Sequence, residues 1–401
     1  MTLLRPEEID PEPLVQGIIR WTEVETPSDR PDLIDRLLDI VEDDFEGLPV
    51  ERRRFPATDR GGQLLLRYAP PGCAGAPVTA MGHVDTVWSV GTLARRPVRM
   101  DGNRLSGPGI FDMKAGSYLA TETLRRIAAA GLVPPRPLAV LLTGDEEIGS
   151  DASRGLIESL AADSAIVLIP EPSFGPDIAV VTARKGWGRF TLRAEGRSAH
   201  AGGNLFDGRS AIREIARQIL DIETRTNAET GLTFNVGTVR GGTRPNVVPA
   251  EAEIAVDMRA ATVADGEAAT AAMLARRPFD RDVRVTVTGG LNRLPFERTE
   301  PVARLYDAAR RLAAQLGMRL GETSRGGVSD GNLAAAAGAP VLDGLGCGGG
   351  GAHAEDEHID LTTVAPRASL LRGMIISGQF QNWALRSDEP IDPSLGSLPG
   401  R

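Results

Sequence analysis

The sequence of 401 residues is poor in cysteine, histidine and aromatic side chains, and it has no long hydrophobic run. Its two cysteines, Cys73 and Cys347, are too few for a disulfide framework or a cysteine-type zinc finger. No apolar stretch approaches the roughly 20 residues of a membrane-spanning helix, so we expect no membrane partner. Acidic residues outnumber basic ones, 54 to 45, and this net charge of −9 argues against a nucleic-acid partner.

A secretory signal is also missing from the start of the chain. Residues 1–17 are acidic and rich in proline, whereas such a signal begins basic and continues apolar. We therefore expect a cytoplasmic protein. The composition, 41% hydrophobic and 25% charged, is that of a globular protein, and the length favours two or three domains. Residues 386–401, rich in Pro, Ser, Gly and Asp, are expected to form a flexible tail.

Three short apolar runs, at 77–81, 138–143 and 165–169, lead into polar residues that can bind a metal ion. A helix is expected over 115–130, and the strand–helix–strand order predicts βαβ units with parallel strands. Because ligands bind beyond the carboxyl ends of such strands, the side chains there should lie close together. They are His83, Glu146, Glu147 and Glu171, and a fourth run at 340–345 leads through a glycine-rich loop to His353.

Residues 184–296 have a different order of elements. Strands are expected at 187–195, 232–240, 252–259 and 283–288, and helices at 210–223 and 264–276. This β-α-β-β-α-β order is that of a ferredoxin-like domain. The sequence therefore predicts an α/β protein with a discontinuous domain, 1–183 and 297–401, into which a second domain, 184–296, is inserted.

Two pairs of neighbouring polar residues could carry chemistry. His83 and Asp85 leave the same face of a strand end, which suits an imidazole that binds metal while its other nitrogen donates to a carboxylate. A capping Asp beside a chance His explains this pair equally well. Glu146 and Glu147 repel each other unless solvent, a cation or a shared proton intervenes. Most such pairs are solvated loop residues, but beside other candidate ligands one could bind metal while the other handles protons.

The candidate ligands contain imidazole and carboxylate groups but no thiolate. Such a set suits Zn²⁺, Mn²⁺ or Co²⁺ in a catalytic site. A pair of metal ions needs a bridging carboxylate and roughly two further protein ligands each. Five candidates match that requirement: His83, Asp112, Glu147, Glu171 and His353.

Two rival interpretations are weaker. The loop at 107–114 is rich in glycine, but it lacks the Gly-Lys-Ser/Thr ending of a phosphate-binding loop and the third glycine of a dinucleotide fingerprint. We expect its glycines to let the backbone pass close to a metal site. Cys347 lies in a glycine run without the following helix that usually activates a nucleophilic thiol, so we expect a small buried thiol.

The order of motifs along the chain resembles one known family. The motifs are Gly82-His83-Val84-Asp85-Thr86-Val87, Gly107-x-Gly109-x-x-Asp112-Met113-Lys114, Asp145-Glu146-Glu147-x-Gly149-Ser150, Glu171-Pro172, Ser198-Ala199-His200-Ala201-Gly202, Arg244-Pro245-Asn246-Val247-Val248-Pro249 and His353. This is the cocatalytic-zinc metallopeptidase family of glutamate carboxypeptidases, acetylornithine deacetylases, succinyl-diaminopimelate desuccinylases and aminoacylases. The stretch 322–330 is similar to the bacterial folate-cleaving glutamate carboxypeptidases. Ala354 departs from the serine that is common after this histidine.

The resemblance implies a role for each matched residue. Asp112, followed by a cis peptide bond, would bridge two Zn²⁺ ions, with Co²⁺ or Mn²⁺ as possible replacements. One metal ion would be held by His83 and Glu171, the other by Glu147 and His353, and Asp85 would orient His83. Glu146 would be the general base, and His200 would stabilise the oxyanion in the partner subunit's active site. The substrate carboxylate would be bound by Asn246, Arg259 and Arg325. Residues 184–296 would form a dimerisation or lid domain, and the rest a zinc-peptidase domain with a mainly parallel, twisted sheet flanked by helices.

The implied activity is hydrolysis of an amide bond next to a carboxylate-bearing amino acid. A carboxypeptidase that releases C-terminal glutamate or a similar residue is the leading hypothesis, with a small peptide or N-acyl amino acid as substrate and a homodimer as the assembly. An N-acyl-amino-acid deacylase is the main alternative. A non-catalytic metal-binding protein and a nucleotide-dependent enzyme are less well supported, because Glu146 is present and the glycine loops lack nucleotide motifs.

Overall fold

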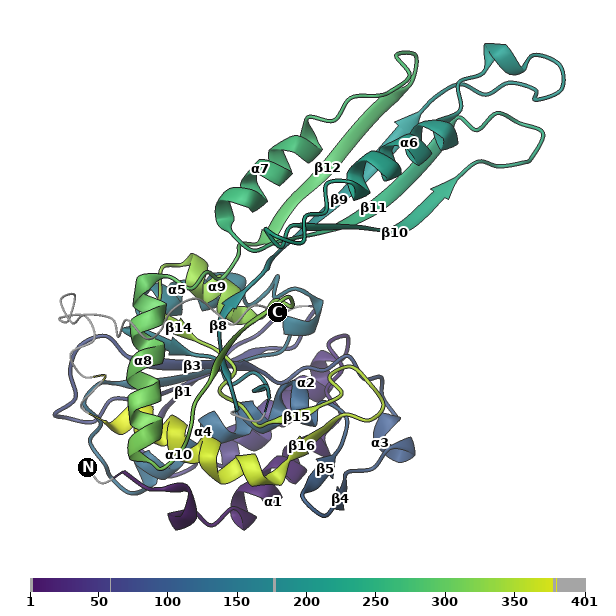
Figure 1. Ribbon diagram of the computed structural model, residues 1–401. Helices are drawn as coiled ribbons and strands as arrows, with labels where there is room; N and C mark the ends of the chain where they lie inside the picture. The colour runs from purple at the N-terminus through teal and green to yellow at the C-terminus, as the bar shows by residue number, and fades with distance from the viewer. Residues whose placement is uncertain (1–2, 58, 176–177, 378–379, 381–401) are drawn as a thin grey trace. The chain divides into compact units, whose positions relative to one another are not determined.

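The computed structural model describes residues 3–57, 59–175, 178–377 and 380, so the predicted tail at 386–401 lies outside the described residues. Contacts between residues divide the chain into two compact units (Figure 1). The first unit comprises the chain up to Thr182, residues 298–324 and the chain from Ser329 onward. The second comprises residues 183–297 together with 325–328.

A six-stranded sheet forms the centre of the first unit. Its strands, in spatial order, are β1 (Glu51–Phe55), β2 (Gln63–Tyr68), β6 (Leu138–Thr143), β3 (Val78–His83), β7 (Ile166–Leu168) and β14 (Val341–Leu342). The last four are mutually parallel, as the apolar runs predict. β2 runs antiparallel to β6, and β1 antiparallel to β2, so the sheet is mixed. This antiparallel edge was not expected from the sequence.

Helices cover both faces of this sheet. On one face, α4 (Ala115–Ala129) packs against β3 and β6, with α1 (Glu12–Thr22) and α10 (Val364–Ile376) against α4. On the other, α5 (Arg154–Ala162) packs with α9 (Asp330–Ala336) (Figure 1). All six residues of β3 and of β6 are buried, because neither face meets water. The first unit also contains α2 (Pro31–Asp43), α3 (Thr92–Arg95) and α8 (Glu300–Gln315).

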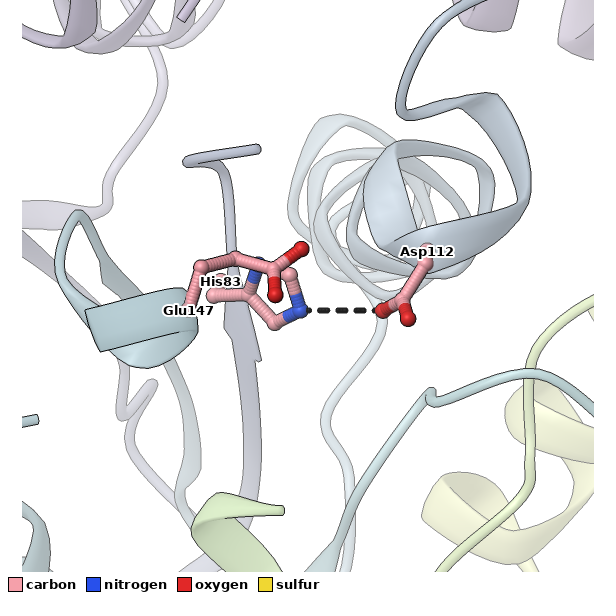
Figure 2. Close-up of side chains that lie close together, drawn as sticks. All are labelled: His83, Asp112 and Glu147. Carbon is pink, nitrogen blue, oxygen red and sulfur yellow. Dashed lines mark hydrogen bonds and ion pairs between the residues drawn. The ribbon is translucent and has the colours of Figure 1, made fainter. Parts of the chain in front are cut away.

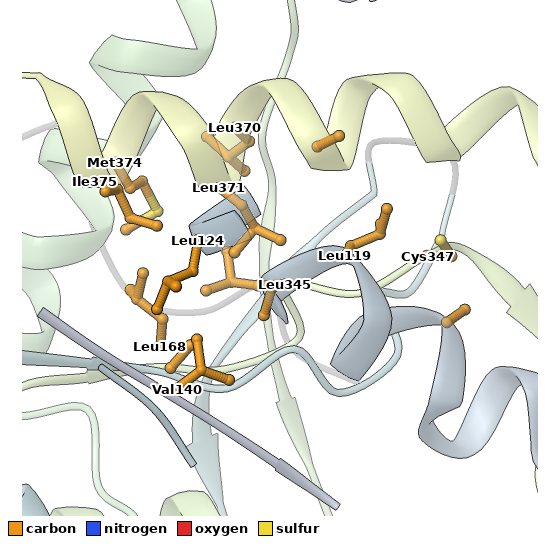
Figure 3. Close-up of a cluster of buried hydrophobic side chains, with 14 of the residues drawn as sticks. Leu119, Leu124, Val140, Leu168, Leu345, Cys347, Leu370, Leu371, Met374 and Ile375 are labelled. Atoms are coloured by element: carbon orange, nitrogen blue, oxygen red, sulfur yellow. The ribbon is translucent and has the colours of Figure 1, made fainter. Parts of the chain in front are cut away.

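The core of the first unit lies between α10, α4 and the sheet. Leu370, Leu371 and Met374 of α10 point toward Leu124 of α4 in Figure 3. Cys347 belongs to the same cluster and is 2% exposed, so the prediction of a buried thiol is confirmed. Burial raises the pKa of this thiol to about 12, which leaves it protonated and a poor nucleophile at neutral pH.

A small second sheet brings distant parts of the first unit together. Its order is β15 (Gly349–Gly350), β16 (His358–Asp360), β5 (Arg104–Ser106) and β4 (Arg99–Asp101). The loop from β15 to β16 carries His353, and β5 leads into the loop of Asp112. Pairing of β16 with β5 therefore fixes these two loops against each other, although they lie some 240 positions apart in the sequence.

The second unit has the predicted β-α-β-β-α-β order. Its elements are β9 (Gly186–Glu195), α6 (Ala211–Glu223), β10 (Thr233–Gly241), β11 (Glu251–Ala260), α7 (Val263–Leu274) and β12 (Arg284–Arg293). The strands form one antiparallel sheet in the order β10-β11-β9-β12, and its alternating buried residues pack against the two helices. Among the described residues, no helix has both the length and the apolar character that crossing a membrane requires.

Residues 325–328 belong to the second unit although the sequence assigns them to the surrounding domain. β8 (Val180–Arg184) pairs with β13 (Glu322–Arg325) in a two-stranded sheet. The Lys185 N–H donates to the Arg325 carbonyl at 2.9 Å, and the Arg184 guanidinium donates to the Gly327 carbonyl at 3.2 Å. These hydrogen bonds tie the end of β13 to the start of the second unit.

Candidate active site

The ends of three parallel strands and two loops place five predicted ligands around one point of the first unit. His83 is the last residue of β3, Glu147 lies in the 3₁₀ turn Glu146–Ile148 after β6, and Glu171 follows β7. Asp112 precedes α4, and the peptide bond from Asp112 to Met113 is cis. The parallel order β6-β3-β7 brings the carboxyl ends of these strands to one edge, which is why the three side chains meet.

The carboxylate of Asp112 lies between the two histidines. Its Oδ1 is 3.2 Å from His83 Nε2, and its Oδ2 is 3.4 Å from His353 Nε2. His83 Nε2 is also 3.7 Å from Glu171, and His353 Nε2 is 3.1 Å from Glu147. Figure 2 shows His83, Asp112 and Glu147 pointing toward one another, and each offers a ligand atom within 4.8 Å of the others. The donors thus form two groups that share Asp112.

The tautomer of His83 is fixed by its backbone surroundings. Its Nδ1 lies 3.0 Å from the Asp85 carbonyl, which can only accept a hydrogen bond, so Nδ1 carries a proton. In the neutral ring Nε2 is then a bare acceptor, yet it faces the carboxylates of Asp112 and Glu171. Acceptors in such contact require a cation between them, either a second proton on the ring or a metal ion.

Electrostatics support the same conclusion. Burial alone lowers the pKa of His83, but contacts with Asp112 and Asp85 outweigh it and raise that pKa well above its usual value. Hydrogen bonds to Asp112 and Glu147 raise the pKa of His353 to about 10. Burial favours neutral Asp112, but the two histidines outweigh it and lower its pKa. Burial raises the pKa of Glu147. The site therefore attracts positive charge, and its imidazole and carboxylate donors fit divalent metal ions.

Asp85 is fully buried, and it contacts other residues besides His83. Its Oδ1 is 3.4 Å from His83 Nδ1, a longer distance than that from Nδ1 to the Asp85 carbonyl. The carboxylate also accepts the backbone N–H groups of Glu146 and Glu147, both at 3.2 Å, and the Ser28 hydroxyl at 2.7 Å. Asp85 therefore fixes the turn that carries the acidic pair. Glu146 in that turn is half-buried, and its charge contributes to the raised pKa of His83.

The remaining predicted site residues belong to the second unit. His200 is exposed in a turn, and its Nδ1 accepts the N–H groups of Gly202 and Gly203, both at 3.1 Å. The structure brings Asn246 next to this turn, because the Asn246 carbonyl accepts the Ala201 N–H at 3.0 Å.

The two predicted substrate-binding arginines differ in their surroundings. Arg259 on β11 forms a two-pronged ion pair with Asp257, with hydrogen bonds of 2.9 and 3.1 Å, and its guanidinium lies over the Trp187 ring. Arg325 lies at the end of β13. Partial burial and the nearby charge of Arg184 lower the pKa of Arg325.

The glycine-rich loop before Asp112 is built for close packing rather than for phosphate. A Cβ on Gly109, which has φ +72°, would come within 2.2 Å of a Thr86 methyl group. The N–H groups of Gly109, Phe111 and Asp112 all donate to the Glu357 carboxylate. Those donors are therefore not available to a nucleotide phosphate.

Two buried acids of the site region were not predicted from the sequence. Glu357 accepts the N–H groups around Asp112, and Asp330 accepts the hydroxyls of Ser150 at 2.6 Å and Thr143 at 3.2 Å on either side of the acidic pair. Glu357 stands in the run Glu355-Asp356-Glu357, which has the composition of a solvated loop. Only the three-dimensional structure distinguishes it from its neighbours.

Comparison with known proteins agrees with this geometry. Residues 79–377 match peptidase family M20/M25/M40. The chain is 31% identical over 311 residues to carboxypeptidase G2 of Pseudomonas sp. (strain RS-16), a match that covers 76% of this chain and 74% of that enzyme. It is also 31% identical over 227 residues to acetylornithine deacetylase of Edwardsiella ictaluri, covering 53% of this chain and 57% of the deacetylase.

Solved structures share the fold. Aminopeptidase PepT from Bacillus cereus superposes with a TM-score of 0.74 at 20% identity, covering 94% of this chain and 99% of that one. A M20 family metallo-carboxypeptidase from Sulfolobus solfataricus gives a TM-score of 0.66 at 14% identity, covering 90% and 98%. The predicted fold class and family resemblance are confirmed. The chain belongs to peptidase family M20/M25/M40, and the prediction of a metallopeptidase or related amidohydrolase is confirmed at the level of that family.

Proposed function

We propose that the protein is a dinuclear zinc hydrolase that releases a C-terminal glutamate or similar residue from a small peptide or N-acyl amino acid. The observation that carries the proposal is the position of Asp112, whose two oxygens face two different histidines at 3.2 and 3.4 Å. Each histidine is in turn close to one further carboxylate. This arrangement supports a bridging role for Asp112 between two cations.

The donor groups suggest how the metal ions would be shared. His83 and Glu171 would hold one ion, Glu147 and His353 the other, and Asp112 both. When bound, the ions would supply the Lewis acidity that makes water nucleophilic at neutral pH and polarises the amide carbonyl. Co²⁺ and Mn²⁺ accept the same donors. Asp85 would keep Nε2 of His83 directed at the site by fixing the proton on Nδ1.

Glu146 is proposed as the general base and acid. It is half-buried, it belongs to no proposed metal group, and its backbone is anchored by Asp85. Its carboxylate would take a proton from the attacking water and return it to the leaving nitrogen, as general acid–base catalysis requires.

His200 is proposed to stabilise the oxyanion that develops at the scissile carbonyl. Because Nδ1 accepts two backbone N–H groups, the proton of the neutral ring lies on Nε2. The ring is thereby prepared to donate from Nε2 to an anionic oxygen. The two N–H groups that set this tautomer, those of Gly202 and Gly203, belong to the same turn as His200.

Recognition of the substrate carboxylate is assigned to Arg325, with Asn246 and Arg259 in supporting roles. The repulsion between Arg325 and Arg184 is a charge arrangement that a carboxylate would relieve, and arginine can bind it through two parallel hydrogen bonds. Arg259 is already paired with Asp257, which favours an indirect contribution.

A homodimer through the second unit is part of the proposal. β10 is an edge strand, and an open edge can pair with a second copy of the chain. Large apolar side chains are also exposed on this unit, among them Phe206 (90%), Leu220 (68%) and Val239 (62%). Such exposed side chains are typical of interaction surfaces. The location is proposed to be cytoplasmic, in keeping with the two unpaired cysteines.

Zinc binding should release protons. Contacts with carboxylates raise the pKa of His353 to about 10 and that of His83 well above its usual value, so zinc binding should displace protons from both rings and weaken as the pH is lowered. Calorimetry in buffers of different ionisation enthalpy measures this release. His353→Ala should lower both the zinc content and the proton release, whereas His358→Ala should change neither. Zinc binding without proton release would contradict the ligand assignment.

Replacing the proposed base should abolish turnover without removing the metal. Glu146→Gln keeps the shape of the side chain but cannot take a proton, so kcat should fall by about 10²–10⁴. The zinc content by elemental analysis should remain that of the wild type. Glu158→Gln, on α5, is the matched control and should leave kcat unchanged. A Glu146→Gln enzyme with more than a tenth of the wild-type kcat would remove Glu146 from the mechanism.

A substrate panel separates the carboxypeptidase from the deacylase. N-acyl amino acids and dipeptides ending in Glu, Asp, Lys or Leu should be compared with the same compounds carrying a C-terminal amide. We expect preference for free C-terminal Glu, and Arg325→Met should lower kcat/KM by about 10–100-fold because it removes charge-assisted hydrogen bonds. Arg281→Met, an exposed arginine of the same unit, is the control. Preference for N-acetylated substrates regardless of the C-terminal residue would favour the deacylase.

The role of His200 in a partner subunit can be tested by mixing two inactive variants. His200→Ala and Glu146→Ala should each be inactive alone, but a hybrid dimer contains one site in which both residues are intact. Activity should therefore reappear after subunit exchange, which mass spectrometry of differently labelled chains can verify. Absence of activity despite verified exchange would mean that His200 does not act across the dimer.

A further inference from the structure

Glu357 is a buried carboxylate whose two oxygens are both fully engaged. Its Oε1 accepts the backbone N–H groups of Phe111 at 3.0 Å and Asp112 at 3.1 Å. Its Oε2 accepts the N–H of Gly109 at 2.8 Å and the Trp88 indole N–H at 2.7 Å. The residue as a whole is 0% exposed. Four donors from two separate segments thus converge on one side chain.

Burying a carboxylate is costly unless hydrogen bonds replace its water. Here four donors take the place of that water: burial raises the pKa of Glu357, and the hydrogen bonds from Gly109, Asp112, Trp88 and Phe111 oppose that rise. Hydrogen bonds to an ionised acceptor are stronger than neutral ones. The four hydrogen bonds therefore fix the backbone around Glu357.

The segments that Glu357 joins are those that carry three of the proposed ligands. Asp112 is tied directly through its own N–H. Trp88 lies five residues after His83, in the loop that leaves β3. His353 lies four residues before Glu357 in the loop between β15 and β16, whose turn is closed by the Glu357 N–H donating to the Ala354 carbonyl at 3.1 Å.

We propose that Glu357 is a positioning residue that holds the Asp112 loop, and with it the bridging carboxylate, in the metal-binding conformation before any metal arrives. Its carboxylate accepts backbone N–H groups and the Trp88 indole N–H, so it would act through the backbone of Asp112. This inference rests on the proposed metal site.

Glu357→Gln is the decisive variant, because an amide cannot replace the carboxylate here. Whichever way the amide lies, its NH₂ group faces two N–H donors, either those of Phe111 and Asp112 or those of Gly109 and Trp88. Zinc affinity, measured by competition with a chromophoric chelator, should fall by about 10–100-fold, as is usual when a partner of a metal ligand is lost.

Glu122→Gln is the matched control. Glu122 is also a buried acid of the first unit, 6% exposed, but its ion pairs are with Arg125 and Arg126 of its own helix, α4. This variant should lower the melting temperature and leave the zinc affinity unchanged. If Glu357→Gln binds zinc as tightly as Glu122→Gln, the positioning role is wrong, while the proposed function stands. If the wild type binds no zinc, the proposed function itself fails.

Hydrogen exchange tests the same idea first in the wild-type protein, where no variant has to fold. In the chelated wild-type protein, the peptide containing residues 107–114 should exchange slowly, because its N–H groups are held by Glu357 and not by metal. In Glu357→Gln the same peptide should exchange faster, while α4 remains protected. Rapid exchange of 107–114 in the metal-free wild type would show that the loop is not held in advance and would overturn the inference.

Discussion

Three carboxylates and two imidazoles can share one small volume only if positive charge lies among them. The contacts around the two histidines bring acceptor to acceptor at 3.1–3.7 Å, and burial of the carboxylates makes an uncompensated arrangement costly. Protons on the histidines can supply that charge, and divalent ions would supply it better because one ion can bind several donors at once. The carboxylates that raise the pKa of both histidines would therefore also attract divalent cations.

Side-chain carboxylates that accept backbone N–H groups hold this crowded site in place. Asp85 fixes the turn of Glu146 and Glu147, and Glu357 fixes the loop of Asp112. Both acids are completely buried. The backbone of each loop is held by a separate buried acid and not by the loop's own acidic side chains. Each loop can therefore keep a carboxylate close to other carboxylates without a change in its backbone conformation. The hydrogen bonds that Asp85 and Glu357 accept therefore oppose the repulsion between the carboxylates of the site.

Much of this site could be predicted because chain direction and ligand type are visible in the sequence. Apolar runs that lead to His83, Glu147 and Glu171 predict parallel strands with these side chains at one edge, and the structure has the side chains there. The antiparallel β1 was missed because Arg-rich 51–55 has no apolar pattern, and β2 was missed although Leu64, Leu65 and Leu66 form a short apolar run. Glu357 was missed for a different reason, since a buried acid whose carboxylate accepts backbone N–H groups looks the same in sequence as an exposed one.

In both units a side chain accepts backbone N–H groups, but the consequence differs. In the first unit the Glu357 carboxylate fixes where the backbone of Asp112 lies, whereas in the second the backbone N–H groups fix where the proton of the His200 ring lies. A scan that replaces side chains can detect Glu357, but it cannot remove the N–H groups of Gly202 and Gly203. Only proline lacks that donor. The chemical state of His200 thus depends on main-chain geometry, and the glycines of this turn keep two N–H groups within reach of one ring nitrogen.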